Sequence, residues 1–313
     1  MEIKLSQSLP LVSVIITTYN RSVFLEKTIE SIQSQTYDNL EILLIDDGSN
    51  KKIAAECEAI TKKYSKCTYY YKPNTGQPDS RNYGIKRSKG VYIGFCDDDD
   101  YWVLDKIEKQ VKILESQVEH SVVTGCIGYV NEKGVKLKEI KCHKGHNHGY
   151  VFDSFLIKNR TASVTPLLRR EVFEKVGYFN PTFTIAEDWE FWRRVSYYYK
   201  FYNTHEVLAY VRLHETNMTN SRAGDPLEWF LLYRKLTKAL NKWGENHFNH
   251  EDFIKINQIE WMIYRKILSN RFPGVLKKIK FIGRVFWNDP KNGLHFTYLL
   301  MRYGKLMLTR NLK

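Results

Sequence analysis

Long apolar runs are missing from this sequence of 313 residues. No stretch reaches the roughly eighteen consecutive apolar residues of a membrane-spanning helix, and the first ten residues lack the apolar core of a signal peptide. The five cysteines include no CxxC pair and suit a reducing compartment better than a disulfide framework. We therefore expect a cytoplasmic protein without a membrane span.

Glycine-rich phosphate-binding motifs are missing as well. Neither GxGxxG nor GxxxxGK[ST] occurs anywhere, so the sequence supports neither a dinucleotide-binding fold nor a P-loop. Without such a glycine cradle, a bound diphosphate would need a metal ion and basic side chains.

Positive charge is abundant but unevenly distributed. The net charge is +13, and the segment 264–313 contains twelve Lys or Arg against one acid, Asp289. That segment therefore carries +11 of the total. Since the remaining 263 residues are nearly neutral, the basic character belongs to the C-terminal tail.

The first hundred residues alternate between strand and helix patterns. Leu11–Thr18 and Glu41–Ile45 are continuous apolar runs, typical of strands covered on both faces. Apolar residues at helical spacing lie between them, and the alternation continues to a strand that begins at Val91. The pattern predicts an α/β fold with a doubly wound, mostly parallel sheet, whose ligands bind beyond the carboxyl ends of the strands.

Four consecutive aspartates, Asp97–Asp100, follow the strand at Val91. Adjacent like charges repel one another unless a cation neutralises them, and clusters of oxygen ligands suit Mg²⁺ or Mn²⁺. The alternative is a solvated acidic turn. Two more polar segments, Thr17–Asn20 and Asp46–Ser49, end neighbouring strands, so the topology places all three at one edge. Arg81 could supply positive charge to a diphosphate there.

A second acidic signal is the segment Thr184–Trp192, TIAEDWEFW. Thr184 and Glu187 have capping-box spacing, which gives Glu187 a structural role at the start of a helix. Asp188 has no such role. It either gains from the helix dipole or serves as a general base held by a rigid helix.

These segments resemble the family-two glycosyltransferases with the GT-A fold. The resemblance rests on SVIITTYNR (13–21), EILLIDDGS (41–49), NTGQPDSRNYGI (74–85), GVYIGFCDDDDYW (90–102) and AEDWEFW (186–192). It implies a GT-A domain over 8–222, with a Rossmann-like nucleotide-sugar half (8–115) and an acceptor half (116–222). It also implies an inverting, metal-dependent transferase that moves a sugar from a nucleotide donor, expected to be UDP-linked, to a hydroxyl of a glycan or lipid-linked acceptor in surface polysaccharide synthesis.

The resemblance also implies roles for individual residues. Asp188 would be the catalytic base. Asp97 and Asp99 match the D-x-D signature and, with His214, would hold Mn²⁺ or Mg²⁺, although a structural role for His214 is equally open. Which two of Asp97, Asp98 and Asp99 touch the metal stays open, because the middle position is usually small. The expected donor contacts are Thr17, Tyr19, Asn20, Asp47, Arg81 and Asp98.

Residues 223–313 predict a basic, aromatic-rich helical extension. Val275–Phe286 places Val275, Ile279, Ile282 and Phe286 on one helical face and basic residues opposite. This pattern suits a helix lying on an anionic membrane, at the inner face, or a helix packed on the protein. Nucleic-acid binding by this region is the alternative function, but it leaves the aspartate run unexplained, so we expect no nucleic acid as a partner.

Overall fold

The structure is a computed structural model, and it describes residues 9–139, 148–214, 226–271, 275–288, 290–291, 293–295 and 297–298. The chain divides into two compact units, Met1–Glu215 and Thr216–Lys313. The first unit contains a nine-stranded sheet, and the described part of the second is helical. Among the described residues, no helix combines the length and the apolar character needed to cross a bilayer.

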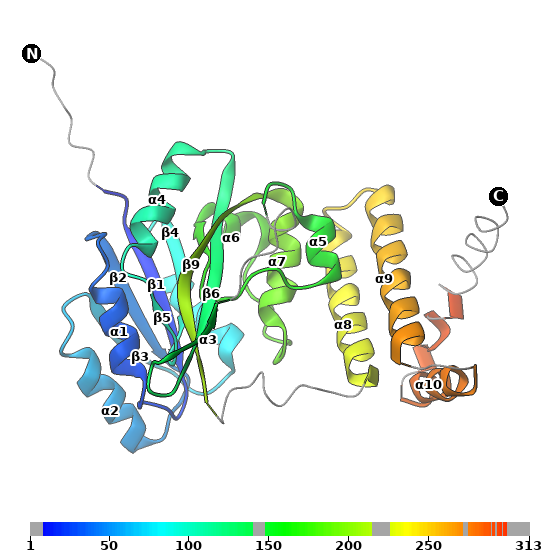
Figure 1. The fold of residues 1–313 in the computed structure, drawn as a ribbon, viewed down its shortest axis with the longest axis horizontal. Helices are drawn as coiled ribbons and strands as arrows, with labels where there is room; N and C mark the ends of the chain where they lie inside the picture. The colour runs from blue at the N-terminus through cyan, green and yellow to red at the C-terminus, as the bar shows by residue number, and fades with distance from the viewer. Residues whose placement is uncertain are drawn as a thin grey trace, which may run out of the picture. The chain divides into compact units, whose positions relative to one another are not determined.

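The N-terminal part of the first unit alternates strands and helices, as predicted. Its elements are β1 (Val12–Thr18), α1 (Leu25–Gln33), β2 (Leu40–Asp46), α2 (Lys51–Thr61), β3 (Cys67–Tyr71), α3 (Gln77–Arg87) and β4 (Tyr92–Asp97). The four strands are parallel where they pair, in the order β3-β2-β1-β4. Figure 1 shows these blue and cyan strands side by side. This is the parallel half of a doubly wound sheet.

The second part of this unit is mixed rather than parallel. Its elements are β5 (Tyr101–Trp102), α4 (Lys106–Ser116), β6 (His120–Asn131), β7 (Lys136–Glu139), α5 (Phe152–Ile157), β8 (Leu167–Arg169), α6 (Glu171–Val176), α7 (Glu187–Tyr198) and β9 (Lys200–Leu213). β8 joins the halves by pairing antiparallel with both β4 and β6. β6 and β9 are parallel, whereas β5 and β7 pair antiparallel with β9 and β6. Beyond the N-terminal strands, the expected parallel pairing thus continues only between β6 and β9.

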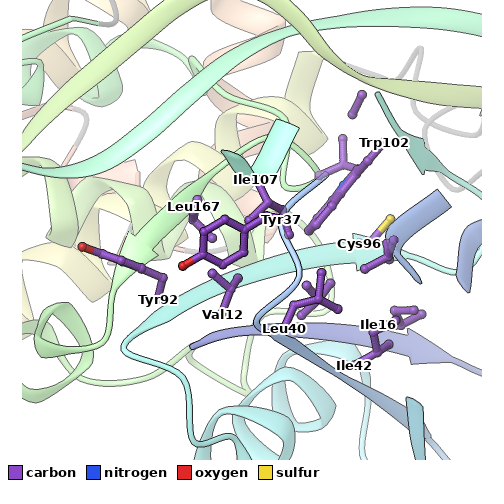
Figure 2. Close-up of a cluster of buried hydrophobic side chains, with 14 of the residues drawn as sticks. Val12, Ile16, Tyr37, Leu40, Ile42, Tyr92, Cys96, Trp102, Ile107 and Leu167 are labelled. Atoms are coloured by element: carbon purple, nitrogen blue, oxygen red, sulfur yellow. The ribbon is translucent and has the colours of Figure 1, made fainter. Parts of the chain in front are cut away.

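Buried side chains cover both faces of the parallel strands. Val12 and Ile16 lie on one face of β1, in a cluster that also contains Trp102 and Ile107 (Figure 2). Ile15 points to the opposite face because side chains alternate along a strand. There it lies against α3, where a Cβ on Gly84 would come 2.6 Å from Ile15 Cγ2. Glycine at position 84 thus lets α3 pack close to the sheet.

The second unit contains three described helices, α8 (Pro226–Gly244), α9 (His250–Arg271) and α10 (Val275–Asn288). The ring centroid of Phe230 on α8 lies 4.3 Å from that of Tyr264 on α9 and 5.9 Å from that of Phe281 on α10. Arg234 pairs with the fully buried Glu260 at 3.2 Å. These contacts confirm the predicted helical C-terminal extension.

The cysteines depart in part from the expectation of a reduced protein. Cys57, Cys67 and Cys96 are free thiols. Burial raises the pKa of Cys57 and of Cys67 to about 12, so neither thiol is poised as a nucleophile. Cys126 on β6, however, is disulfide-bonded.

Candidate active site

The carboxyl ends of β1, β2 and β4 meet at one edge of the sheet. Thr18 pairs in register with Asp46, and Thr17 pairs with Asp97. The topology therefore brings together the three polar segments that the sequence placed at strand ends. Tyr19 is 54% exposed at this edge, whereas Thr17 is buried.

Asn20 is hydrogen-bonded to the segment that follows β2. The Asn20 backbone adopts a positive φ of 51°, and its Oδ1 accepts hydrogen bonds from the backbone N–H and the side-chain amide of Asn50. Gly48 also has a positive φ, 83°, and a Cβ there would come 2.6 Å from the backbone nitrogen of Asn74. Asn20 thus supports the turn that presents Asp47.

The carboxylate of Asp47 is held by the protein itself. Its Oδ1 accepts hydrogen bonds from Lys72 Nζ at 2.5 Å and from the Thr75 backbone N–H at 3.0 Å. Its Oδ2 accepts from the Gly76 backbone N–H at 2.8 Å, and the residue is only 4% exposed. Asp47 therefore organises the loop between β3 and α3, and contact with a nucleobase would require one of its remaining lone pairs.

The four aspartates form a turn whose side chains point to different partners. Asp97 is the most accessible of them, with 34% of its side chain exposed, whereas the other three residues are buried. Asp100 accepts a hydrogen bond from the backbone N–H of Arg212 at 3.0 Å. Burial raises the pKa of Asp100 well above its usual value, and the negative charge of Asp99 adds to this rise. Asp100 is thus a structural member of the run.

Asp98 is enclosed by Thr18 and Arg21. Its Oδ2 accepts a hydrogen bond from Thr18 Oγ1 at 2.6 Å, and its Oδ1 accepts from Arg21 Nε at 2.9 Å and also pairs with the Arg21 NH2 group. Burial raises the pKa of Asp98 to about 6, and Arg21 opposes the rise. Since Asp98 is only 2% exposed, the structure does not bring it to the open side of the site.

Asp99 and His214 lie together, although they are far apart in sequence. Asp99 Oδ2 is 2.9 Å from His214 Nε2 and 2.8 Å from Arg21 NH1. Among the described residues, no group of three His, Cys, Asp or Glu side chains forms a ready-made metal site. Mg²⁺, however, commonly uses one or two protein ligands and completes its shell with substrate phosphates. Asp99 and His214 fit such an open site.

Arg81 joins the aspartate run to α7. Its NH2 group is 3.2 Å from Asp97 Oδ1, and its NH1 group is 3.0 Å from Glu187 Oε1. The guanidinium lies over the rings of Phe95 and Phe179 and is buried. Desolvation raises the pKa values of Asp97 and Glu187, and Arg81 opposes both rises. One buried cation is thus shared by two carboxylates.

The capping-box expectation for Glu187 is wrong. α7 begins at Glu187, and Ala186, with a left-handed backbone at φ 57°, occupies the N-cap position without a side-chain capping hydrogen bond. Thr184 therefore lies outside the helix. The physical reason is the buried Arg81, because an unpaired buried charge costs far more than an unmade helix cap. Glu187 consequently belongs to the candidate active site.

Asp188 is oriented by two side chains that no sequence motif indicates. Asn159 Nδ2 donates to Asp188 Oδ2 at 2.8 Å, and Ser163 Oγ donates to the same oxygen at 3.0 Å. The Trp189 backbone N–H donates to Oδ1 at 2.7 Å. The side chain remains partly accessible to solvent. It is thus held in one orientation at the start of a helix, as a positioned base requires.

Two kinds of predicted residue can now be distinguished. Asp99 and His214 contact each other and Arg21, whereas Asp97 and Arg81 lie together with Glu187, the residue before Asp188. The side chains of Asp98 and Asp47 are buried and point toward the interior of the protein. The partners missed from sequence are Arg21, Lys72, Asn159, Ser163 and Glu187. Each of them contacts a residue that is distant in the chain. Only Arg21 and Glu187 lie within the motifs SVIITTYNR (13–21) and AEDWEFW (186–192), so only these two could have been suggested by the sequence.

Comparisons with known proteins identify the class that this fold and site define. The chain belongs to glycosyltransferase family 2, because the sequence model described as "Glycosyl transferase family 2" matches residues 13–177. A glycosyltransferase of Rickettsia typhi is 32% identical over 238 residues, which cover 74% of this chain and 73% of the relative. One from Haemophilus influenzae is 30% identical and covers 87% of this chain and 85% of the relative. The protein is therefore a glycosyltransferase.

Solved structures show the same fold. TarS of S. aureus, residues 1–349 in complex with UDP-GlcNAc, superposes with a TM-score of 0.64 at 17% identity, covering 88% of this chain and 79% of the 1–349 fragment. The corresponding complex of TarS with UDP gives a TM-score of 0.61. At this identity the similarity establishes the GT-A fold, as predicted.

Proposed function

We propose that this glycosyltransferase moves a sugar from a UDP-linked donor to a hydroxyl of a glycan or lipid-linked acceptor, with inversion at the anomeric carbon. The observation that carries the proposal is the connection Asp97–Arg81–Glu187, which joins the open aspartate to the residue beside Asp188. The UDP-GlcNAc and UDP complexes of TarS support the donor class. The acceptor class and a role in surface polysaccharide synthesis at the cytoplasmic face rest on the family resemblance.

In this proposal Asp188 accepts the proton of the acceptor hydroxyl as its oxygen attacks the anomeric carbon. Asn159 and Ser163 hold Asp188 Oδ2, so the carboxylate does not need to reorient during the reaction. Asp99 and His214 would hold Mn²⁺ or Mg²⁺, and this ion would supply positive charge beside the leaving diphosphate. Arg21, which already contacts Asp99, keeps the buried carboxylates neutralised when no substrate is bound.

Donor hydrolysis tests the donor class directly. The purified chain would be incubated with UDP-, GDP- and dTDP-sugars, each with Mn²⁺, with Mg²⁺ or with EDTA, and release of the nucleotide diphosphate would be measured. We expect slow release of UDP from one UDP-sugar that depends on the metal. Hydrolysis confined to GDP- or dTDP-sugars would refute the assignment of a UDP-linked donor. Equal rates of hydrolysis with EDTA and with Mn²⁺ or Mg²⁺ would refute the dependence on a metal ion.

Asn159 and Ser163 should act as positioning residues for Asp188. Removing a hydrogen bond to a charged group costs about 1.5–3 kcal/mol, so we expect Asn159→Ala to lower kcat by about 10- to 100-fold and Ser163→Ala by somewhat less. KM for the donor should change little.

The matched control is Ser196→Ala. Ser196 is buried in the same helix, α7, but its hydroxyl donates to the Arg193 backbone carbonyl within that helix. Ser163→Thr should recover most of the activity because it keeps the hydroxyl donor. A rate loss in Ser196→Ala equal to that in Ser163→Ala, or a failure of Ser163→Thr to recover activity, would show general structural damage instead of positioning.

A further inference from the structure

Helix α10 has one side packed inside the second unit. Phe281 is 2% exposed and Val285 is fully buried, and the two residues are four positions apart, on one side of the helix. Phe281 meets the ring of Phe230 on α8 edge to face, with centroids 5.9 Å apart. Ile279, which the sequence pattern places on the apolar face of the helix, is 58% exposed. Packing within the unit accounts for Phe281 and Val285.

The other side of α10 exposes large apolar residues. Trp287 is 90% exposed, more than any other large apolar side chain among the described residues. Lys280 is seven positions before Trp287 and Ile279 is eight before it, so all three lie on one side of the helix. Lys280 and Lys277 are both exposed. Packing within the unit does not account for this side.

The charge of α10 is of one sign. Its sequence, VLKKIKFIGRVFWN, contains four basic residues and no acidic residue. An exposed indole beside lysines is unfavourable in water but suits the boundary between lipid headgroups and acyl chains, because the ring enters the apolar layer while the ammonium groups meet anionic headgroups. A partner that is anionic at its surface and apolar just below it therefore suits both the basic residues and the exposed indole of α10.

We propose that the side of α10 formed by Ile279, Lys280 and Trp287, called here the Trp287 face, docks on the surface of an anionic phospholipid bilayer. The helix would lie in the plane of the interface, with Trp287 and Ile279 inserted and Lys277 and Lys280 beside the headgroups. The attraction of each lysine is screened by salt, so attachment is reversible. Docking through the Trp287 face would not depend on the donor, the metal or the catalytic base.

Vesicle sedimentation of the full chain tests the proposal. We expect the chain to sediment with phosphatidylglycerol vesicles at low salt, to be released by high salt, and to remain in solution with phosphatidylcholine vesicles. Trp287→Ala and Lys277→Gln/Lys280→Gln should each weaken binding at least tenfold. The matched control is Trp229→Ala, because Trp229 is 44% exposed on α8 of the same unit, and its binding should stay within twofold of the unchanged chain.

The variants distinguish docking through the Trp287 face from nucleic-acid binding and from general damage to the fold. An equal loss of vesicle binding in Trp229→Ala and Trp287→Ala, or unchanged sedimentation of Trp287→Ala, would contradict docking through the Trp287 face. Binding to single-stranded RNA that depends on Trp287, without sedimentation on vesicles, would show that nucleic acid is the partner. Ile279→Asp gives a second test, since an exposed position tolerates the charge in the fold but not in the bilayer. UDP binding is measured on every variant and should not change, so failure here leaves the proposed transfer reaction untouched.

Discussion

Asp99→Ala is expected to abolish Mn²⁺-dependent UDP binding and turnover while leaving the fold intact. Asp99 Oδ2 lies 2.9 Å from His214 Nε2, and these two side chains form the proposed metal site. Removing the carboxylate takes away the oxygen ligand and leaves only the imidazole of His214, whereas hard divalent ions such as Mg²⁺ prefer oxygen ligands. The fold should persist because Arg21 keeps its pair with Asp98.

UDP affinity measured by titration calorimetry with Mn²⁺ and with EDTA checks this expectation. Asp105→Ala is the matched control, since Asp105 follows the same turn but pairs on the surface with Lys109 at 2.9 Å. It should bind UDP as the unchanged chain does. If Asp99→Ala retains UDP affinity both with Mn²⁺ and with EDTA, Asp99 is not a metal ligand and His214 is its structural partner.

The parallel half of the fold could be predicted from sequence because its signals are local. Continuous apolar runs such as Leu11–Thr18 leave only a strand covered on both faces, and helices at 3.6-residue spacing separate them. The order and pairing of the strands in the second half could not be predicted in the same way. There β8 has three residues, and it pairs with Ile93 of β4 and Val123 of β6, both far earlier in the chain. A strand that short carries no periodicity.

The pairing of charges was the hardest part of the site to predict. The motif that contains Asp98 does not indicate its partner in the structure, Arg21, which lies 77 residues away in the chain. Similarly, Thr184 and Glu187 have the spacing of a capping box, whereas Glu187 pairs with Arg81 from the other half of the unit. Local patterns report what a residue can do with its neighbours in sequence. A buried arginine needs a carboxylate partner, because an unpaired buried charge strongly destabilises the fold. That partner can come from any position in the chain.

The two sides of α10 show the same limit in a helix. The apolar residues of α10 are spread over more of the helix surface than one neighbouring helix can cover. Helical periodicity alone therefore does not decide which of them are buried. The stripe that is buried contains Phe281 because Phe230 on α8 lies next to it. This left Ile279 and Trp287 exposed, an outcome that depends on tertiary packing and not on the helix itself.

Asp188→Asn should separate chemistry from donor binding. Asparagine keeps the size of the side chain and its place at the start of α7 but cannot accept the proton, so we expect kcat to fall by roughly two to four orders of magnitude. Asp188 is not among the expected donor contacts, and UDP affinity should therefore be nearly preserved. Steady-state rates with the donor identified from the hydrolysis panel, together with calorimetric UDP binding, check both expectations.

Glu187→Gln is the matched comparison because it makes the same chemical change one residue earlier. Its carboxylate holds Arg81, which in turn holds Asp97, so the loss should appear first in donor affinity, by about tenfold or more, and in thermal stability. The two variants should thus differ in kind as well as in size. If Asp188→Asn loses donor affinity as much as rate, Asp188 is a binding residue; if Glu187→Gln lowers kcat as strongly as Asp188→Asn with UDP affinity unchanged, Glu187 becomes the better candidate for the base.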